Sequence, residues 1–214
     1  MRTVIGRPTF LIIMLIAATT WTGLQCRWKV TKGAMKTGEQ LKSSIENFED
    51  NRQKLSEKVV ISLEDAQKKL TKEDPDLPKI AKDWEVEWNR IQDRYQKMKD
   101  DFDQTGTNSQ AYFAQLDALS NNISNETLRK QELAKNAELK KKWDVTYQKA
   151  SVSITKITQV LESGKDFHMV LVASSIRQKL EQNVDELENI ARQAKELLTD
   201  LEAFTQAGRA LVEG

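Results

Sequence analysis

The chain has 214 residues, of which 39% are hydrophobic and 30% are charged, and this composition suits an elongated molecule with a thin core. Eight glycines and three prolines provide few turns, which argues against a β-rich fold and for a few long helices. The 33 basic and 32 acidic residues nearly balance, so the chain lacks the clustered excess of Lys and Arg on which nucleic-acid binding depends, and we expect no nucleic-acid partner.

Residues 1–26 have the layout of a signal peptide or membrane anchor. Arg2 and Arg7 precede the apolar block 10–18, and no charged residue lies between Pro8 and the end of the segment. A span of the bilayer needs about 20 apolar residues, and the threonines that follow the block favour a cleaved or lipidated signal over a retained span. The order of charges predicts export, with the remainder of the chain facing the periplasm or exterior.

Cys26, the single cysteine, is the candidate lipidation site. It follows the apolar segment directly, where a bacterial lipoprotein signal places its acylated cysteine. Leu24 lies one position late for that signal, and Gln25 replaces the expected small residue. Two interpretations therefore stay open: a lipidated Cys26, or a signal anchor in which Cys26 is an inert residue at the membrane interface.

After a linker at 27–36, residues 37–214 form the predicted helical coiled-coil domain. Thr37 and Gln40 have the spacing of a capping box, which predicts a helix start at Thr37. Apolar residues then recur at spacings of three and four, interrupted by Arg52, and form one narrow stripe: Leu41, Ile45, Phe48, Leu55, Val59, Leu63, Ala66 and Leu70. Two prolines at 75 and 78 end this helix, and Asp76 is expected to cap the next one.

The second helix is unusually aromatic. Its stripe consists of Ile80, Trp84, Trp88, Ile91, Tyr95, Met98 and Phe102. Because the rings continue the spacing of the stripe, we interpret them as core packing rather than as a ligand platform. The polar stretch 104–109 predicts a loop after this helix.

The third and fourth helices complete the domain. Asn and Ser residues at 121–125 predict a break, and Gly164 in 164–166 predicts a turn. The intervening stripe is Leu128, Leu139, Trp143, Tyr147, Ala150, Ile154, Ile157 and Leu161, and the last one is Leu171, Ile176, Leu180, Val184, Leu187, Ala191, Ala194, Leu198, Leu201 and Phe204. Narrow stripes and short breaks together predict an all-α fold, an elongated antiparallel bundle of coiled-coil hairpins.

Signatures of chemistry are missing from the sequence. The one histidine, His168, lies in an apolar string and excludes a multi-histidine metal site. Glycine-rich phosphate loops, paired CxxC motifs and HExxH do not occur. We therefore expect no catalytic residue, no cofactor and no metal, and a protein that is not an enzyme.

The chain resembles an uncharacterised bacterial family of coiled-coil, lipoprotein-like envelope proteins, a domain of unknown function. The resemblance rests on a signal that ends in Cys26, on the element Ala34-Met35-Lys36-Thr37-Gly38, and on the layout of residues 119–133 and 143–180. It implies an envelope location and no functional residues.

Three functional classes follow from these patterns. The leading hypothesis is a membrane-tethered scaffold or binding protein of the cell envelope, attached through its N-terminal segment and engaged with a protein partner or with copies of itself. The first alternative is a regulatory bundle that senses a small molecule between helices, with Trp84, Trp88, Tyr95 and Trp143 as candidate lining. The second alternative is an envelope-stress protein that binds membrane through amphipathic helices.

Overall fold

The computed structural model describes the backbone of residues 9–177 and 183–213 and the side chains of 32–177 and 185–212. Within these ranges the chain forms four helices and no strand: α1 (Thr9–Leu70), α2 (Leu77–Asn121), α3 (Glu126–Arg177) and α4 (Asn183–Glu213). The prediction of an all-α fold is confirmed.

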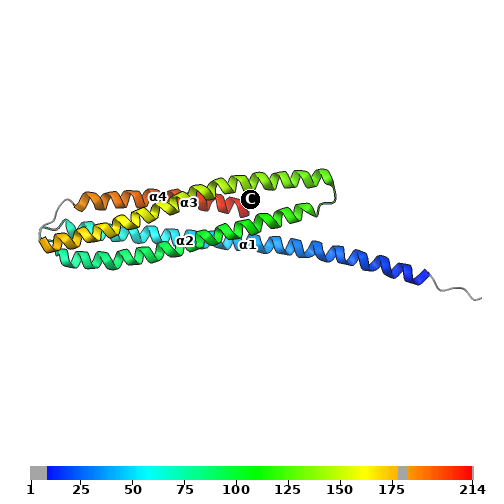
Figure 1. The fold of residues 1–214 in the computed structure, drawn as a ribbon, viewed down its shortest axis with the longest axis horizontal. Coiled ribbons are helices and arrows are strands. Elements are labelled where there is room, and N and C mark those ends of the chain that lie inside the picture. The colour runs from blue at the N-terminus through cyan, green and yellow to red at the C-terminus, as the bar shows by residue number, and fades with distance from the viewer. Residues whose placement is uncertain (1–8, 178–182, 214) are drawn as a thin grey trace, which may run out of the picture.

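The helices form a closed, elongated four-helix bundle (Figure 1). Each helix lies directly beside two others, in the pairs α1–α2, α2–α3, α3–α4 and α1–α4. Successive helices run antiparallel, so the chain goes up and down the bundle twice. The N-terminal part of α3 continues past the C-terminal end of α4, and there α3 lies beside α2 alone (Figure 1).

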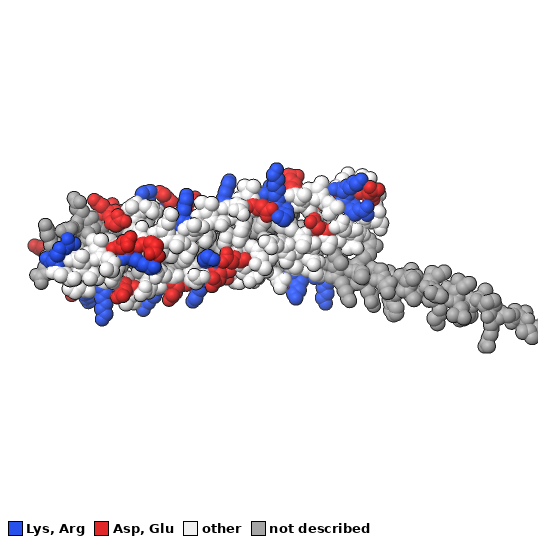
Figure 2. Space-filling model, in the orientation of Figure 1, with Lys and Arg blue, Asp and Glu red and all other residues white. Residues whose placement is uncertain are grey.

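The apolar stripes supply the core. Every member of the predicted stripes of α1 and α2 is buried, as are Trp143, Ala150, Ile154, Ile157 and Leu161 of α3 and Leu187, Leu198, Leu201 and Phe204 of α4. The predicted stripe of α3 fails at its N-terminal end, because Leu128 and Leu139 are 53% and 37% exposed, and Ile176 of the last predicted stripe is 78% exposed. Leu180 and Val184 lie outside the described side chains. Acidic and basic side chains are interspersed over the visible face (Figure 2), as the balanced composition predicts.

Two of the predicted breaks are confirmed, and both carry a helix cap. Asp76 Oδ1 accepts a hydrogen bond of 3.1 Å from the backbone N–H of Lys79 at the start of α2. Asn125 Oδ1 accepts one of 3.1 Å from the backbone N–H of Leu128 at the start of α3. Each cap satisfies one of the free N–H groups in the first turn of its helix.

The predicted helix start at Thr37 is wrong. The Thr37 hydroxyl donates 3.0 Å to the carbonyl of Ala34, one turn earlier, and α1 is continuous through residues 27–36, which the sequence assigned to a linker. A threonine followed by a glutamine three residues later has the same spacing inside a helix as at its start. The pattern alone does not distinguish the two positions.

The predicted loop at 104–109 and the predicted turn at 164–166 are also wrong, because both stretches lie inside continuous helices. The Thr105 hydroxyl donates 2.8 Å to the carbonyl of Asp101, and the Ser109 hydroxyl donates 2.8 Å to that of Gly106. These bonds satisfy the hydroxyls within α2 itself, so both residues can be buried in the bundle. The chain reverses instead after Asn121 and after Arg177, where α2 and α3 end.

Candidate functional site

Three of the four aromatic residues proposed to line a ligand site instead join α2 to α3. Trp84, Trp88 and Tyr95 are buried along one face of α2. Each donates a hydrogen bond to a backbone carbonyl of α3: Trp84 Nε1 to Gly164 at 2.8 Å, Trp88 Nε1 to Leu161 at 2.9 Å, and Tyr95 Oη to Ile154 at 3.0 Å. The polar atom of each ring is therefore satisfied inside the bundle.

Gly164 is the residue that permits this close approach. A Cβ added at position 164 would lie 1.9 Å from Cε2 and Cζ2 of Trp88, far inside contact distance. The indole of Trp88 thus occupies the space that any other residue at 164 would fill. Gly164, predicted as a turn residue, serves helix packing.

The faces of these rings are also covered. Trp84 stacks on Trp88 with centroids 4.8 Å apart, and its ring meets Phe167 of α3 edge to face at 4.9 Å. The small hollow that Trp84 borders has a volume of about 10 Å³, room for one water at most. These residues are core, as the spacing predicted, and only Trp143 of the four borders a larger cavity.

A second aromatic cluster contains one or two rings from each of the four helices. Its members are Phe48 of α1, Phe102 of α2, Trp143 and Tyr147 of α3, and Phe204 of α4. Phe204 is the centre: its centroid lies 5.2 Å from those of Phe48, Phe102 and Trp143, and 6.0 Å from that of Tyr147. This four-helix aromatic cluster sets the distance between the helices where the cavity opens.

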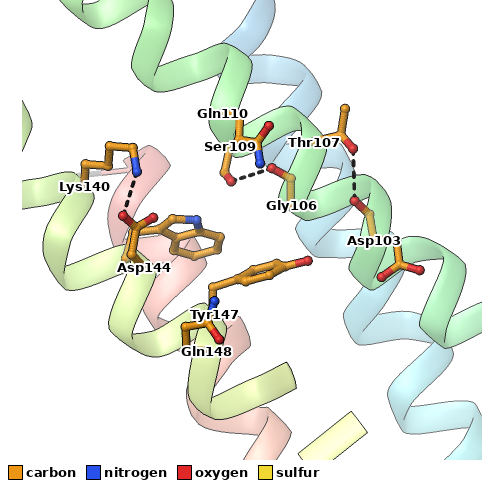
Figure 3. A pocket seen from close by; sticks show the side chains of 10 residues that line it. Asp103, Gly106, Thr107, Ser109, Gln110, Lys140, Asp144, Tyr147 and Gln148 are labelled. Atoms are coloured by element: carbon orange, nitrogen blue, oxygen red, sulfur yellow. Dashed lines mark hydrogen bonds and ion pairs between the residues drawn. The ribbon is translucent and has the colours of Figure 1, made fainter. Parts of the chain in front are cut away.

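The cavity lies between α2 and α3 and has a volume of about 400 Å³ (Figure 3). Gly106 and Ser109 line it from α2, and Trp143 and Tyr147 line it from α3. The Tyr147 ring points across the gap toward α2 (Figure 3), and a Cβ at Gly106 would lie 2.4 Å from its hydroxyl oxygen. We call this the α2–α3 cavity, and its size falls in the range of small-molecule sites.

Charges around the α2–α3 cavity are already paired. Asp103 forms an ion pair of 2.6 Å with Lys99, and Asp144 forms one of 2.6 Å with Lys140. Burial raises the pKa of Tyr147, and the Asp103 carboxylate adds to the increase. Its hydroxyl therefore stays protonated, and within the described residues it makes no hydrogen bond. The cavity can hold a small polar molecule through this hydroxyl and the rings.

A buried ionic cluster joins α1 to α4. Arg52 donates from Nε and Nη2 to the two carboxylate oxygens of Glu49, both at 2.7 Å, and from Nη1 to the carbonyl of Leu198 at 2.9 Å. The Thr205 hydroxyl donates 2.8 Å to Glu49. Arg52 and Glu49 are only 8% and 6% exposed. Arg52, which interrupts the stripe in the sequence, is accommodated because its charge is paired in a bidentate contact.

The electrostatics of Glu49 follow from these contacts. Burial by itself would raise the pKa of Glu49, but the hydrogen bonds from Arg52 and Thr205 and the charge of Arg52 outweigh it, and the pKa lies below its ordinary value. For Arg52 the bond to Glu49 raises the pKa. The pair is charged throughout the physiological range and is joined to α4 through Leu198 and Thr205.

His168 and Cys26 are the two reactive residues that the sequence analysis singled out. His168 lies half-buried on α3, and its Nδ1 has no hydrogen-bond partner among the described residues. Cys26, the candidate lipidation site, lies in α1, outside the described side chains. No group of three or more His, Cys, Asp or Glu in the described part of the chain could hold a metal ion. Among residues 32–177 and 185–212, no helix carries an apolar stretch long enough to span a membrane.

Comparison with known proteins adds no relative: no family model, curated protein or solved structure matches this chain. The family resemblance therefore stays a prediction.

Sequence reasoning missed three features of these sites. It assigned Gly106 and Ser109 to a loop, and it placed Tyr147 in a stripe without a cavity. It noted Arg52 only as an interruption, although a glutamate three residues earlier on the same helix face could have indicated an internal ion pair.

Proposed function

We propose that this chain is a non-enzymatic, membrane-tethered helical scaffold or binding protein of the bacterial cell envelope, with its body facing the periplasm or exterior. The observation that carries the proposal is the use of Trp84, Trp88 and Tyr95. The hydrogen-bond donors of these rings bond to carbonyls of α3, and their faces pack inside the bundle. This arrangement favours a rigid bundle that binds a partner over a bundle that senses a ligand between its helices. The apolar segment behind Arg2 and Arg7 supports export and attachment.

The attachment is tested through Cys26. If the chain is a lipoprotein, a palmitate analogue fed to the cells should label the wild-type chain and not Cys26→Ser. The two chains should then also differ in the cell fraction in which they are found. If the two chains take up equal label, Cys26 is not the lipidation site and the segment acts as an anchor or a cleaved signal. A wild-type chain found only in the soluble cytoplasmic fraction would overturn the envelope assignment itself.

Binding of a protein partner is tested in the native cell. Proximity labelling from a tag after Gly214 should mark envelope proteins, and the same neighbours should be lost when residues 1–26 are deleted. Neighbours that are cytoplasmic enzymes or ribosomal proteins would contradict the proposal.

A second function, the sensing of a small molecule, is favoured by one observation, the α2–α3 cavity. Its unbonded Tyr147 hydroxyl and its ring walls suit a small polar ligand. Gln110 is exposed at the rim, so Gln110→Trp should fill the cavity without disturbing the core. A ligand that raises the melting temperature of the wild type and not of Gln110→Trp would support this function; the same increase in both would exclude the cavity as its site.

A further inference from the structure

One side of α3 carries exposed apolar and basic residues in register. Val145 and Val152 are 51% and 53% exposed and lie one heptad apart, and Lys149 and Lys156 are exposed with the same separation. At 1.5 Å per residue, seven residues correspond to about 10 Å along the helix. The side chains therefore form two parallel rows on this side of the bundle.

Two hollows run along these rows and adjoin each other. One, of about 630 Å³, lies between α3 and α4, with small side chains such as Ser153 and Ala203 on its walls and Phe204 at its floor. The other is a shallow, open depression lined by α3 alone, around Val145. Lys149 borders both. We call the combined surface, from residue 137 to 156 of α3 with the facing part of α4, the α3–α4 face.

The charge of the α3–α4 face is positive. Four lysines and two aspartates line the two hollows. Lys140 is neutralised by Asp144, but Lys141, Lys149 and Lys156 form no ion pair with any side chain that the structure describes. Elsewhere on α3 the lysines at 130, 135, 142 and 165 each pair with a carboxylate of their own helix. Among the lysines of α3, the unpaired ones thus all lie beside the hollows.

We propose that the α3–α4 face binds an acidic amphipathic helix of a partner protein. This inference rests on the proposed scaffold function and names the chemistry of its partner. The face is about 30 Å long at the helical rise, enough for about five turns of a helix lying along α3. The small side chains on the walls of the hollow let the partner helix approach closely. Val145 and Val152 contact its apolar stripe, and acidic residues beside that stripe pair with Lys149 and Lys156.

Two other occupants fit the face less well. A second copy packed on the same face by a two-fold axis would place its own lysines against Lys149 and Lys156, and like charges repel. An anionic membrane would attract the lysines, but a flat bilayer surface would not fill a hollow whose floor is the buried Phe204. A helix with acidic flanks satisfies both the shape and the charge.

The test uses the full chain in a mild nonionic detergent and a fluorescent peptide of three heptads, with Leu at the a and d positions and Glu at e and g. A peptide with Lys in place of Glu is the charge control. Fluorescence anisotropy should give at least about tenfold tighter binding of the Glu peptide, and salt should weaken it. Equal affinities for the two peptides would overturn the proposal.

Variants assign the binding to this face. Lys149→Glu with Lys156→Glu should reverse the preference for the two peptides, while Lys82→Glu with Lys97→Glu, on exposed positions of α2, should leave it unchanged. Ala203→Gln, an exposed position on the wall of the hollow, should weaken binding by about tenfold without lowering the melting temperature. Binding that is insensitive to both changes would contradict the proposal, whatever the cellular location of the protein.

The alternative occupants give distinct results. Displacement of the Glu peptide by phosphatidylglycerol nanodiscs and not by phosphatidylcholine nanodiscs would assign the face to a membrane surface. A wild-type dimer in sedimentation velocity that becomes monomeric in Lys149→Glu with Lys156→Glu would assign it to a second copy. Either result overturns the partner helix, whereas a failure of the envelope assignment would appear only in cell fractionation.

Discussion

Replacement of Gly164 by alanine tests the contact between α2 and α3 most directly. The added Cβ would lie 1.9 Å from Cε2 and Cζ2 of Trp88 and 2.4 Å from its Nε1. Trp88 is 3% exposed, bonded to a carbonyl of α3 and stacked on Trp84, so its ring has no free direction in which to move. The helices must separate or the indole must leave its rotamer.

The expected loss of stability follows from three contributions. Overpacking of a filled core costs about 1–3 kcal/mol. Loss of the Trp88 hydrogen bond costs about 1 kcal/mol more. Alanine in place of glycine in a helix stabilises the folded protein by about 1 kcal/mol through its better helix propensity, which offsets part of this loss. The free energy of unfolding of Gly164→Ala should therefore be lower than that of the wild type by about 1–3 kcal/mol.

Gly38→Ala is the matched control. It also lies inside a helix, but its Cβ would lie 3.7 Å from the nearest ring atom of Tyr112, an ordinary van der Waals contact. This variant should gain about 0.5–1 kcal/mol. Urea unfolding of the full chain in detergent, followed by circular dichroism and by tryptophan fluorescence, measures both.

A double variant separates the steric effect from a general effect on the helix. Trp88→Leu is itself destabilising, but in that background Gly164→Ala should cost less than in the wild type, because the ring atoms it would meet are gone. If Gly164→Ala is as stable as Gly38→Ala, or if its cost is the same in both backgrounds, the close contact between position 164 and Trp88 is refuted.

Four further predictions use the same urea assay. Arg52→Met leaves the Glu49 carboxylate buried without its partner and should cost about 3–5 kcal/mol, whereas the double variant Glu49→Leu with Arg52→Met should cost less; a larger cost in the double variant would contradict the pairing. The pKa of Glu49 in the folded protein lies below its ordinary value of 4.5, so its stabilising contribution is present above about pH 4.5 and is lost as the pH falls through the folded pKa. The wild type should therefore lose stability more steeply below pH 4.5 than the double variant does, and parallel curves would exclude this role. Tyr95→Phe should lower the free energy of unfolding by about 1 kcal/mol, because the Tyr95 hydroxyl is hydrogen-bonded inside the bundle. Tyr147→Phe should change it by no more than about 0.5 kcal/mol, because the Tyr147 hydroxyl has no such bond. Equal effects of the two variants would contradict this difference between the hydroxyls. Asp76→Ala should cost about 1 kcal/mol through loss of the cap on α2, and an unchanged midpoint would argue that the cap is not formed.

The periodicity of apolar residues predicted the class of fold and most of its core. A narrow stripe such as Leu41 to Leu70 can be buried only against other helices, so the spacing along one helix is enough to indicate which side chains are inside. The same local information predicted the cap at Asp76 and the break at 121–125, because both depend on residues within one turn. Neither result requires knowledge of the partner helix.

The errors at the two glycines have one physical cause. Gly164 lies inside α3 because Trp88, far away in the sequence, fills the space beside it, and Gly106 lies inside α2 because Tyr147 points at it. The local sequence does not distinguish a glycine that ends a helix from a glycine that makes room for a ring of a neighbouring helix. The α2–α3 cavity was missed for this reason, since one of its walls was assigned to a loop.

The sequence by itself determined that the chain is helical, which faces of its helices are apolar and where Pro75, Asp76 and Asn125 interrupt it, because all of these depend on neighbours within a few residues. Only the tertiary structure decided that Trp84, Trp88 and Tyr95 bond to carbonyls of α3, that Arg52 pairs with Glu49 against α4, and which lysines of α3 stay unpaired beside a hollow. These depend on which helix lies opposite, and that is fixed by the packing of the whole bundle.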